Sequence, residues 1–124
     1  MERVRFGKDD IDNVLNSEPE RAEYLPFGAI LLDPFGRVVR YNKAEGLISS
    51  RLPADVIGKN FFNDVAPCAK GRAFHGRFFE AVSKGKVNTI FEYEFDYKMQ
   101  PTKVRVHMKS DDCTQGVWIF IKRI

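Results

Sequence analysis

The sequence predicts an α+β fold, in which a five-stranded antiparallel sheet carries helices on one face and a short helical cap precedes the core. Two observations carry this prediction. The chain reads as a hairpin, several short helices, one longer helix and three strands in succession. Two of these last three strands also alternate apolar and polar residues, which is typical of half-buried antiparallel strands.

The length and composition indicate one domain without a membrane-spanning segment. The chain has 124 residues, of which 44% are hydrophobic and 30% are charged. Its longest apolar run is VWIFI at 117–121, far short of the roughly 20 residues that span a bilayer. The N-terminus contains no apolar segment that resembles a secretion signal. We therefore expect a cytoplasmic protein.

Residues 1–26 differ from the rest and are expected to form a cap on the core at 27–124, within the same domain. Asp9 or Asp10 can cap a short helix, DDIDNVLN, whose apolar residues follow helical spacing. A polar segment, SEPERAE at 17–23, follows this helix and ends in Tyr24-Leu25-Pro26.

The core begins with a predicted hairpin. AILLD at 29–33 and VVRYN at 38–42 read as strands, joined by a turn at 33–36 with proline second and glycine fourth. Asn42 can cap a helical turn through residues 44–46, and Pro53 suits the first turn of the next short helix. Residues 73–84 predict a longer helix, with Phe74, Phe78 and Val82 on one face.

The last three strands are expected at 88–97, 102–108 and 116–124. In the first, Phe91, Tyr93, Phe95 and Tyr97 alternate with Glu92, Glu94 and Asp96. In the second, Val104, Val106 and Met108 alternate with Lys103, Arg105 and His107. This pattern places His107 on the charged face, away from the core.

Several functional classes find no support in the sequence. The net charge of +3 comes from interleaved basic and acidic residues, so we expect no nucleic-acid partner. There is no phosphate-binding glycine motif and no cysteine–histidine cluster with metal-ligand spacing. Cys68 could be inert, part of a disulfide, a nucleophile or an attachment point. His107 is expected on the charged face of its strand and His75 has no evident orienting partner, which argues against a thiol enzyme.

The segment YNKAEGLISSR at 41–51 contains three polar side chains at intervals of four residues. Tyr41, Glu45 and Ser49 could bring a phenol, a carboxyl and a hydroxyl to one side. From spacing alone, Glu45 is more often a solvated surface acid.

Together these residues resemble the photoactive yellow protein, or xanthopsin, family of blue-light receptors. The resemblance covers nearly the whole chain and is strongest at VIGKNFFNDVAPC (56–68) and FEYEFDYKMQPTKVRVHMK (91–109). It implies a PAS fold and a bacterial protein that is not an enzyme. It also implies that Cys68 is the attachment point for 4-hydroxycinnamic (p-coumaric) acid, bound as a thioester.

The resemblance also assigns the other site residues. Tyr41 and Glu45 match the residues that bind the chromophore's phenolate, and Ser49 stands where the family often has threonine. Arg51 matches the residue that covers the pocket mouth, while Phe61, Phe95, Tyr97 and Met99 match its wall and the loop above it. A free phenol has a pKa of about 10 and a glutamate of about 4.3, so burial must reverse their order. Light would then isomerise the chromophore, move a proton from Glu45 and loosen the N-terminal cap.

Two residues differ from the usual pattern of the family. Ala69 follows the cysteine where a hydroxyl residue is familiar in the family, and Cys113 is an additional cysteine.

We expect a separate downstream protein as the partner. We also expect the protein to be a monomer, with weak dimerisation as the alternative. The competing interpretation is a PAS module for protein interaction or another ligand, without the p-coumaroyl group. A flavin photoreceptor is disfavoured because the sequence lacks an N-C-R motif.

Overall fold

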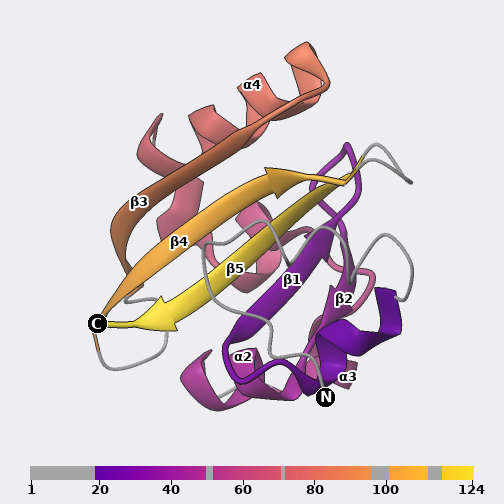
Figure 1. Cartoon of the computed structure of the whole chain (residues 1–124), viewed down its shortest axis with the longest axis vertical. Coiled ribbons are helices and arrows are strands. Elements are labelled where there is room, and N and C mark those ends of the chain that lie inside the picture. The colour runs from indigo at the N-terminus through magenta and orange to yellow at the C-terminus, as the bar shows by residue number, and fades with distance from the viewer. Residues whose placement is uncertain (1–18, 50–51, 71, 96–100, 112–115) are drawn as a thin grey trace.

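The computed structural model describes residues 19–49, 52–70, 72–95, 101–111 and 116–124. Its sheet consists of β1 (Gly28–Leu32), β2 (Val38–Tyr41), β3 (Asn88–Phe95), β4 (Thr102–Ser110) and β5 (Val117–Arg123). The spatial order is β2-β1-β5-β4-β3, with every neighbouring pair antiparallel (Figure 1). The predicted five-stranded antiparallel sheet is therefore confirmed.

The described helices are short. They are the 3-10 helices η1 (Pro19–Tyr24) and η3 (Pro67–Lys70), the π-helical turns η2 (Phe61–Val65) and η4 (Arg72–Gly76), and the α-helices α2 (Lys43–Ser49), α3 (Pro53–Val56) and α4 (Arg77–Lys84). The predicted helix at 73–84 thus begins with a π-helical turn. Most of η1 lies in the polar segment at 17–23, to which the sequence pattern assigned no element.

The turn between β1 and β2 forms as its sequence predicts. Gly36 N donates to Asp33 O at 3.0 Å, and Gly36 has a φ of 87°. A positive φ of this size strains any residue with a Cβ atom, which explains glycine at the fourth position. The carboxylate of Asp33 also accepts from Phe35 N and Arg37 N, both at 2.9 Å.

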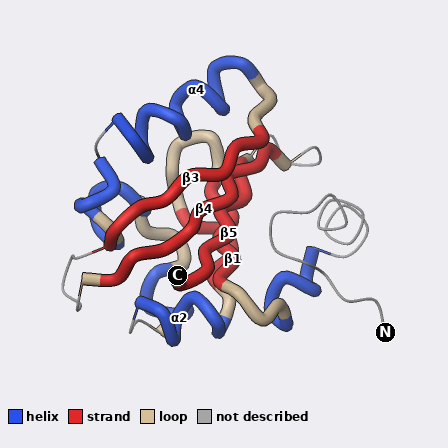
Figure 2. The backbone as a smooth tube through the Cα atoms, turned by 60° about the vertical axis from the view of Figure 1, so that its left-hand side comes forward, coloured by secondary structure: helices blue, strands red, loops and turns tan. Residues whose placement is uncertain are grey.

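The sheet buries a separate apolar cluster on each face. On one face, the helices from α3 to α4 and the aromatic side of β3 enclose the larger cluster. On the other face, η1 lies over Ala29, Leu31, Trp118 and Phe120. Figure 2 shows the sheet between these two layers, with η1 opposite α4. β1 and β5 are consequently buried on both sides, which explains their continuous apolar sequences.

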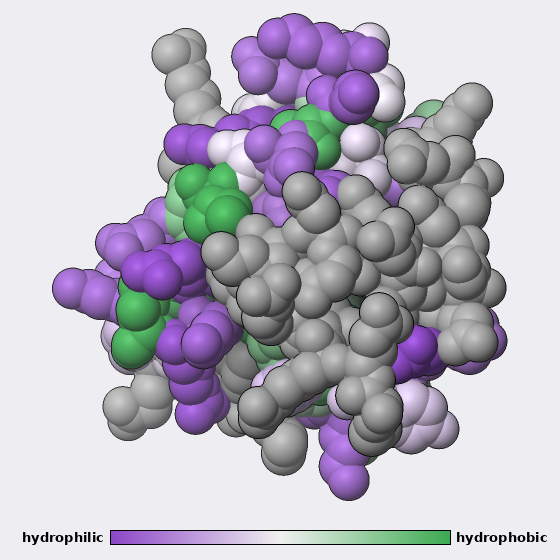
Figure 3. All heavy atoms as spheres, viewed as in Figure 1, coloured by the Kyte–Doolittle hydropathy of each residue, from purple (hydrophilic) through white to green (hydrophobic). Residues whose placement is uncertain are grey.

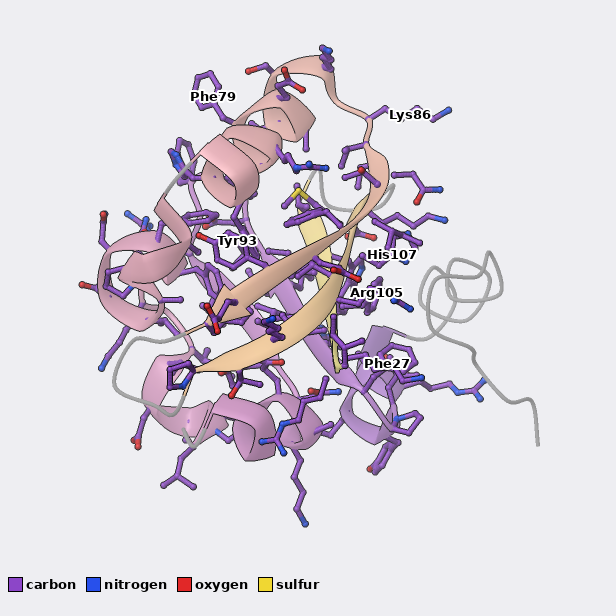
Figure 4. The ribbon with its side chains drawn as sticks, turned by 90° about the vertical axis from the view of Figure 1, so that its left-hand side faces the viewer. Phe27, Phe79, Lys86, Tyr93, Arg105 and His107 are labelled. Carbon is purple, nitrogen blue, oxygen red and sulfur yellow. The ribbon has the colours of Figure 1, made fainter. Side chains whose placement is uncertain are left out.

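The burial of His107 corrects the sequence prediction. His107 lies on the face opposite the larger cluster, but it is only 1% exposed. The β4–β5 register places it beside Phe120, and its Nε2–H donates to Asn88 Oδ1 at 2.6 Å. Alternation assigned its face correctly, but it could not show that apolar residues cover this part of that face. Figure 4 shows His107 and Arg105 on the side of the sheet opposite Tyr93.

The described residues on the face drawn in Figure 3 are mainly hydrophilic. Figure 3 shows hydrophobic residues on this side only as small, separate patches. Arg105 and Glu92 form an exposed ion pair across β4 and β3, at 3.6 Å. Within the described residues, no helix is long and apolar enough to cross a bilayer.

Candidate functional site

The candidate site lies in the larger cluster, between the sheet and the short helices. Tyr41 ends β2, Phe95 ends β3 and Phe61 begins η2, and all three are buried in this cluster. Ala66 and Ala69, which lie on either side of Cys68, belong to the same cluster. The fold therefore brings segments 41, 61, 66–69 and 95 together, although they are far apart in the sequence.

Glu45 is a buried acid rather than a solvated one. It lies in the first turn of α2 and is only 3% exposed. Its carboxyl group lies against Gly28 at the start of β1, where Oε2 occupies the space that a Cβ atom at position 28 would need. This placement rules out the surface-acid interpretation that spacing alone favoured.

Asn42 holds the start of α2 in place. Its Oδ1 accepts from Glu45 N at 2.9 Å and from Ala29 N at 3.0 Å. Its Nδ2 donates to Ala22 O at 2.9 Å and to Phe27 O at 3.0 Å. One side chain thus joins the site helix, the first strand and η1. The predicted helix cap at Asn42 is correct, but its bonds to residues 22 and 27 could not be predicted from the motif.

An Asn42→Ala substitution is expected to lower the free energy of unfolding by about 2 kcal/mol, because it removes a helix cap and leaves buried backbone groups without their partners. Asn60→Ala provides the matched control. Asn60 also caps a helical turn, accepting from Phe62 N and Asn63 N, but it is half-exposed. We expect about 1 kcal/mol for the control. Urea unfolding of both variants tests this ranking, and equal losses would contradict it.

The structure describes the backbone at two of the remaining predicted site residues. Ser49 is the last residue of α2, and Cys68 lies in η3. Arg51, Tyr97 and Met99 lie outside the described residues, as does the predicted helix at 9–16. Their contributions to a site stay predictions.

Aromatic rings form the wall behind the described part of the site. Phe74 lies at its centre, with ring centroids 5.3–5.8 Å from Phe61, Phe91, Tyr93 and Phe95. Helical spacing correctly predicts Phe74 on the buried face of its helix, but it does not connect this residue with the site. The link is the tertiary contact between η4 and β3, which no local pattern contains.

The two histidine rings lie on opposite faces of the sheet, and each packs against aromatic residues. The His75 ring packs against Phe62, with centroids 4.6 Å apart, and stacks against Phe78 at 6.4 Å. His107 lies on the opposite face of the sheet, bonded to Asn88. Among the described residues, no group of three or more histidines, cysteines and acids has the arrangement of a metal site.

Comparison with known proteins places this geometry in a family. Residues 10–124 match the model of the PAS fold. The chain is 56% identical to photoactive yellow protein from Cereibacter sphaeroides, with 100% of both chains covered. It is 53% identical to photoactive yellow protein from Rhodobacter capsulatus, with 99% of each covered.

Solved structures agree with these sequence matches. The photoactive yellow protein domain of a sensor histidine kinase from Rhodospirillum centenum superposes with a TM-score of 0.82 at 37% identity. The match covers 90% of this chain and 98% of that domain. A quorum-sensing receptor PAS domain from Cronobacter turicensis has a TM-score of 0.64 at 15% identity, covering 79% of this chain and 93% of the other. This second likeness concerns the fold alone.

Proposed function

Because the chain belongs to the photoactive yellow protein family of PAS-fold proteins, we propose that it is a blue-light photoreceptor carrying p-coumaric acid as a thioester on Cys68. The family consists of photoreceptors rather than enzymes. The observation that carries the proposal is the buried Glu45 carboxyl, held beside a cluster that contains Tyr41 and, on either side of Cys68, Ala66 and Ala69. The relatives are bacterial, and we propose a cytoplasmic location for this protein.

The described residues fit such a group. A phenolate needs buried hydrogen-bond donors at one end and apolar walls along its ring. Tyr41 and Glu45 are buried acids that can donate in their neutral forms, and Phe61 and Phe95 contribute buried aromatic surface. Ser49, Arg51, Tyr97 and Met99 would complete the pocket, as would the backbone N–H of Cys68.

Burial explains how Glu45 would act. Removal from water disfavours the charged form and therefore raises the pKa of the Glu45 carboxyl. A neutral carboxyl can donate a hydrogen bond to an ionised acceptor, and such bonds are roughly twice as strong as those between neutral groups. Tyr41 would donate in the same way. The two donors together would hold a phenol ionised at neutral pH.

When bound, the p-coumaroyl group supplies absorption of blue light and a trans-to-cis isomerisation. Glu45 holds a proton in the dark and releases it after illumination. The carboxylate that remains is buried, and an uncompensated buried charge costs several kcal/mol. This is a large share of the roughly 5–15 kcal/mol that stabilises a domain. The protein lowers this cost by opening.

Reconstitution tests the proposal. The purified apoprotein and a Cys68→Ala variant are each incubated with activated p-coumaric acid, and visible spectra are recorded. We expect a band in the blue that forms only in the wild type, bleaches under blue light and returns in darkness. If the folded wild type takes up no pigment, the protein is instead a PAS module for another ligand or partner.

We further propose that residues 1–26 loosen in the lit state and present a surface to a separate downstream protein. The bonds of Asn42 support this, because they connect Glu45 N with Ala22 O in η1. Hydrogen exchange in these residues is expected to be at least about tenfold faster in the light than in the dark. Equal rates would contradict the role of the cap, while leaving the pigment assignment untouched.

A further inference from the structure

Gly28 is the residue whose missing side chain makes room for the Glu45 carboxyl. A Cβ atom built at position 28 overlaps Glu45 Oε2 and lies 3.2 Å from Glu45 Cδ. It also lies 3.2 Å from the carbonyl oxygen of Ile121, the partner of Gly28 on β5. A side chain larger than hydrogen and the carboxyl in its present position cannot both occupy this space.

Backbone conformation does not account for glycine at this position. Gly36, Gly58 and Gly85 have φ values of 87°, 88° and 73°, where other residues are strained. Gly28 is not among the glycines with positive φ and lies in a regular strand. Glycine inside a strand loses more conformational freedom on folding than alanine does and is therefore less stable there. The space requirement of the carboxyl gives this glycine a reason.

The backbone geometry prevents the carboxyl from avoiding position 28 through a shift of the helix. The Oδ1 atom of Asn42 accepts from both Glu45 N and Ala29 N, at 2.9 and 3.0 Å, and so fixes α2 against β1. A glutamate at the third helical position often accepts from the backbone N–H of the cap residue. Here that N–H, from Asn42, donates to Ala29 O at 3.1 Å, and the carboxyl turns to Gly28 instead.

We propose that Gly28 is the positioning residue for the Glu45 carboxyl, and that its hydrogen side chain sets where this carboxyl meets the phenol of the pigment. The part concerning the pigment rests on the function proposed above. A methyl group at position 28 leaves the backbone register in place and moves the flexible end of Glu45. The donor is then displaced from the phenolate although Glu45 itself is unchanged.

The first test uses the apoprotein and needs no pigment. Unfolding in urea is measured for the wild type, Gly28→Ala, Glu45→Ala and the double variant. In the wild-type background, Gly28→Ala is expected to lower the folding equilibrium constant. In the Glu45→Ala background, the methyl group fills vacated space, so the same change is neutral or stabilising. We expect the change in the folding equilibrium constant to differ by about tenfold or more between the two backgrounds. A difference of this size is typical of energetic coupling between contacting residues. Equal effects in both backgrounds would overturn the proposal.

The second test separates positioning from a merely structural role. The pigment-loaded wild type and Gly28→Ala are titrated with acid, and the loss of the blue band is followed. We expect the titration midpoint of the phenol in Gly28→Ala to move up by one pH unit or more, together with a shift of the Glu45 C=O band in the infrared. The positioning role would be overturned if the two substitutions are coupled in the stability of the apoprotein but Gly28→Ala leaves the phenol titration and the infrared band unchanged.

The two tests also distinguish this proposal from the function on which it rests. If the wild type forms no blue band, the photoreceptor assignment fails and the role of Gly28 toward a phenol fails with it. Coupling between Gly28→Ala and Glu45→Ala in the unfolding of the apoprotein would then still show that the glycine accommodates the carboxyl. If the wild type forms the band but the unfolding measurements show no coupling between the two substitutions, only the role of Gly28 is wrong.

Discussion

A Phe74→Ala variant is expected to lose about 3–5 kcal/mol of unfolding free energy, the range typical of deleting a buried aromatic side chain. Phe74 is 0% exposed. Its ring contacts those of five other aromatic residues, namely Phe61, Phe62, Phe91, Tyr93 and Phe95. The cavity left by the substitution would lie between η2, η4 and β3, where closely packed neighbours leave little scope for collapse.

The same helical segment supplies a matched control. Phe79 lies five residues further on, in α4, and is 65% exposed, and Figure 4 shows it pointing away from the sheet. Phe79→Ala should change stability by no more than about 0.5 kcal/mol, as is usual for surface sites. Urea unfolding monitored by circular dichroism compares the two variants. Similar losses for both would contradict the assignment of Phe74 as the centre of the cluster.

Among the variants that retain the pigment, the largest functional effect is expected from Glu45→Gln. Glutamine has nearly the same shape and can still donate a hydrogen bond through its amide, so the pigment should bind and remain ionised. It has no proton to release, so the proton transfer that follows illumination should be lost. The amide is also a weaker donor to a phenolate than a carboxylic acid, which should raise the phenol's pKa by about one unit.

The sign of the pH effect follows from this. The phenol is ionised above its pKa and yellow only in that form, so a raised pKa moves the loss of colour in acid to a higher pH. Infrared difference spectra should lack the band of the protonated Glu45 carboxyl. Glu80→Gln makes the same chemical change on the exposed side of α4, and it should leave both the titration and the proton release as in the wild type. A light-induced carboxyl signal that persisted in Glu45→Gln would exclude Glu45 as the donor.

Local sequence patterns predicted the parts of the fold that depend on local interactions. The alternation of Phe91, Glu92, Tyr93 and Glu94 gave β3 and its buried face correctly. The turn at 33–36 and the cap at Asn42 were also correct, since their chemistry resides in a few adjacent residues. No local pattern indicated the 3-10 helix η1 within the expected cap, because its polar sequence owes its helical turn partly to packing of Ala22 on the sheet.

The site depended on contacts that the sequence does not contain. Spacing placed Tyr41 and Glu45 near one another but favoured a solvated Glu45, and only the resemblance to a family suggested its burial. Gly28 lies 17 positions before Glu45, and their contact arises from the packing of α2 on β1. His107 illustrates the opposite error. Alternation assigned it to the correct face, but His107 is buried there, packed on Phe120 and bonded to Asn88.

The burial of β5 on both faces has a practical consequence for optical measurements. Trp118 is the only tryptophan in the chain. It is 4% exposed and belongs to the cluster that also contains Ala22 and Leu25, stacked on Phe120 with ring centroids 5.6 Å apart. Its neighbour Ile119 points to the other face, toward the proposed pigment. Indole emission is therefore an intrinsic probe of η1 and the cap, separated from the pocket by the thickness of a single strand, and it can follow their movement without any added label.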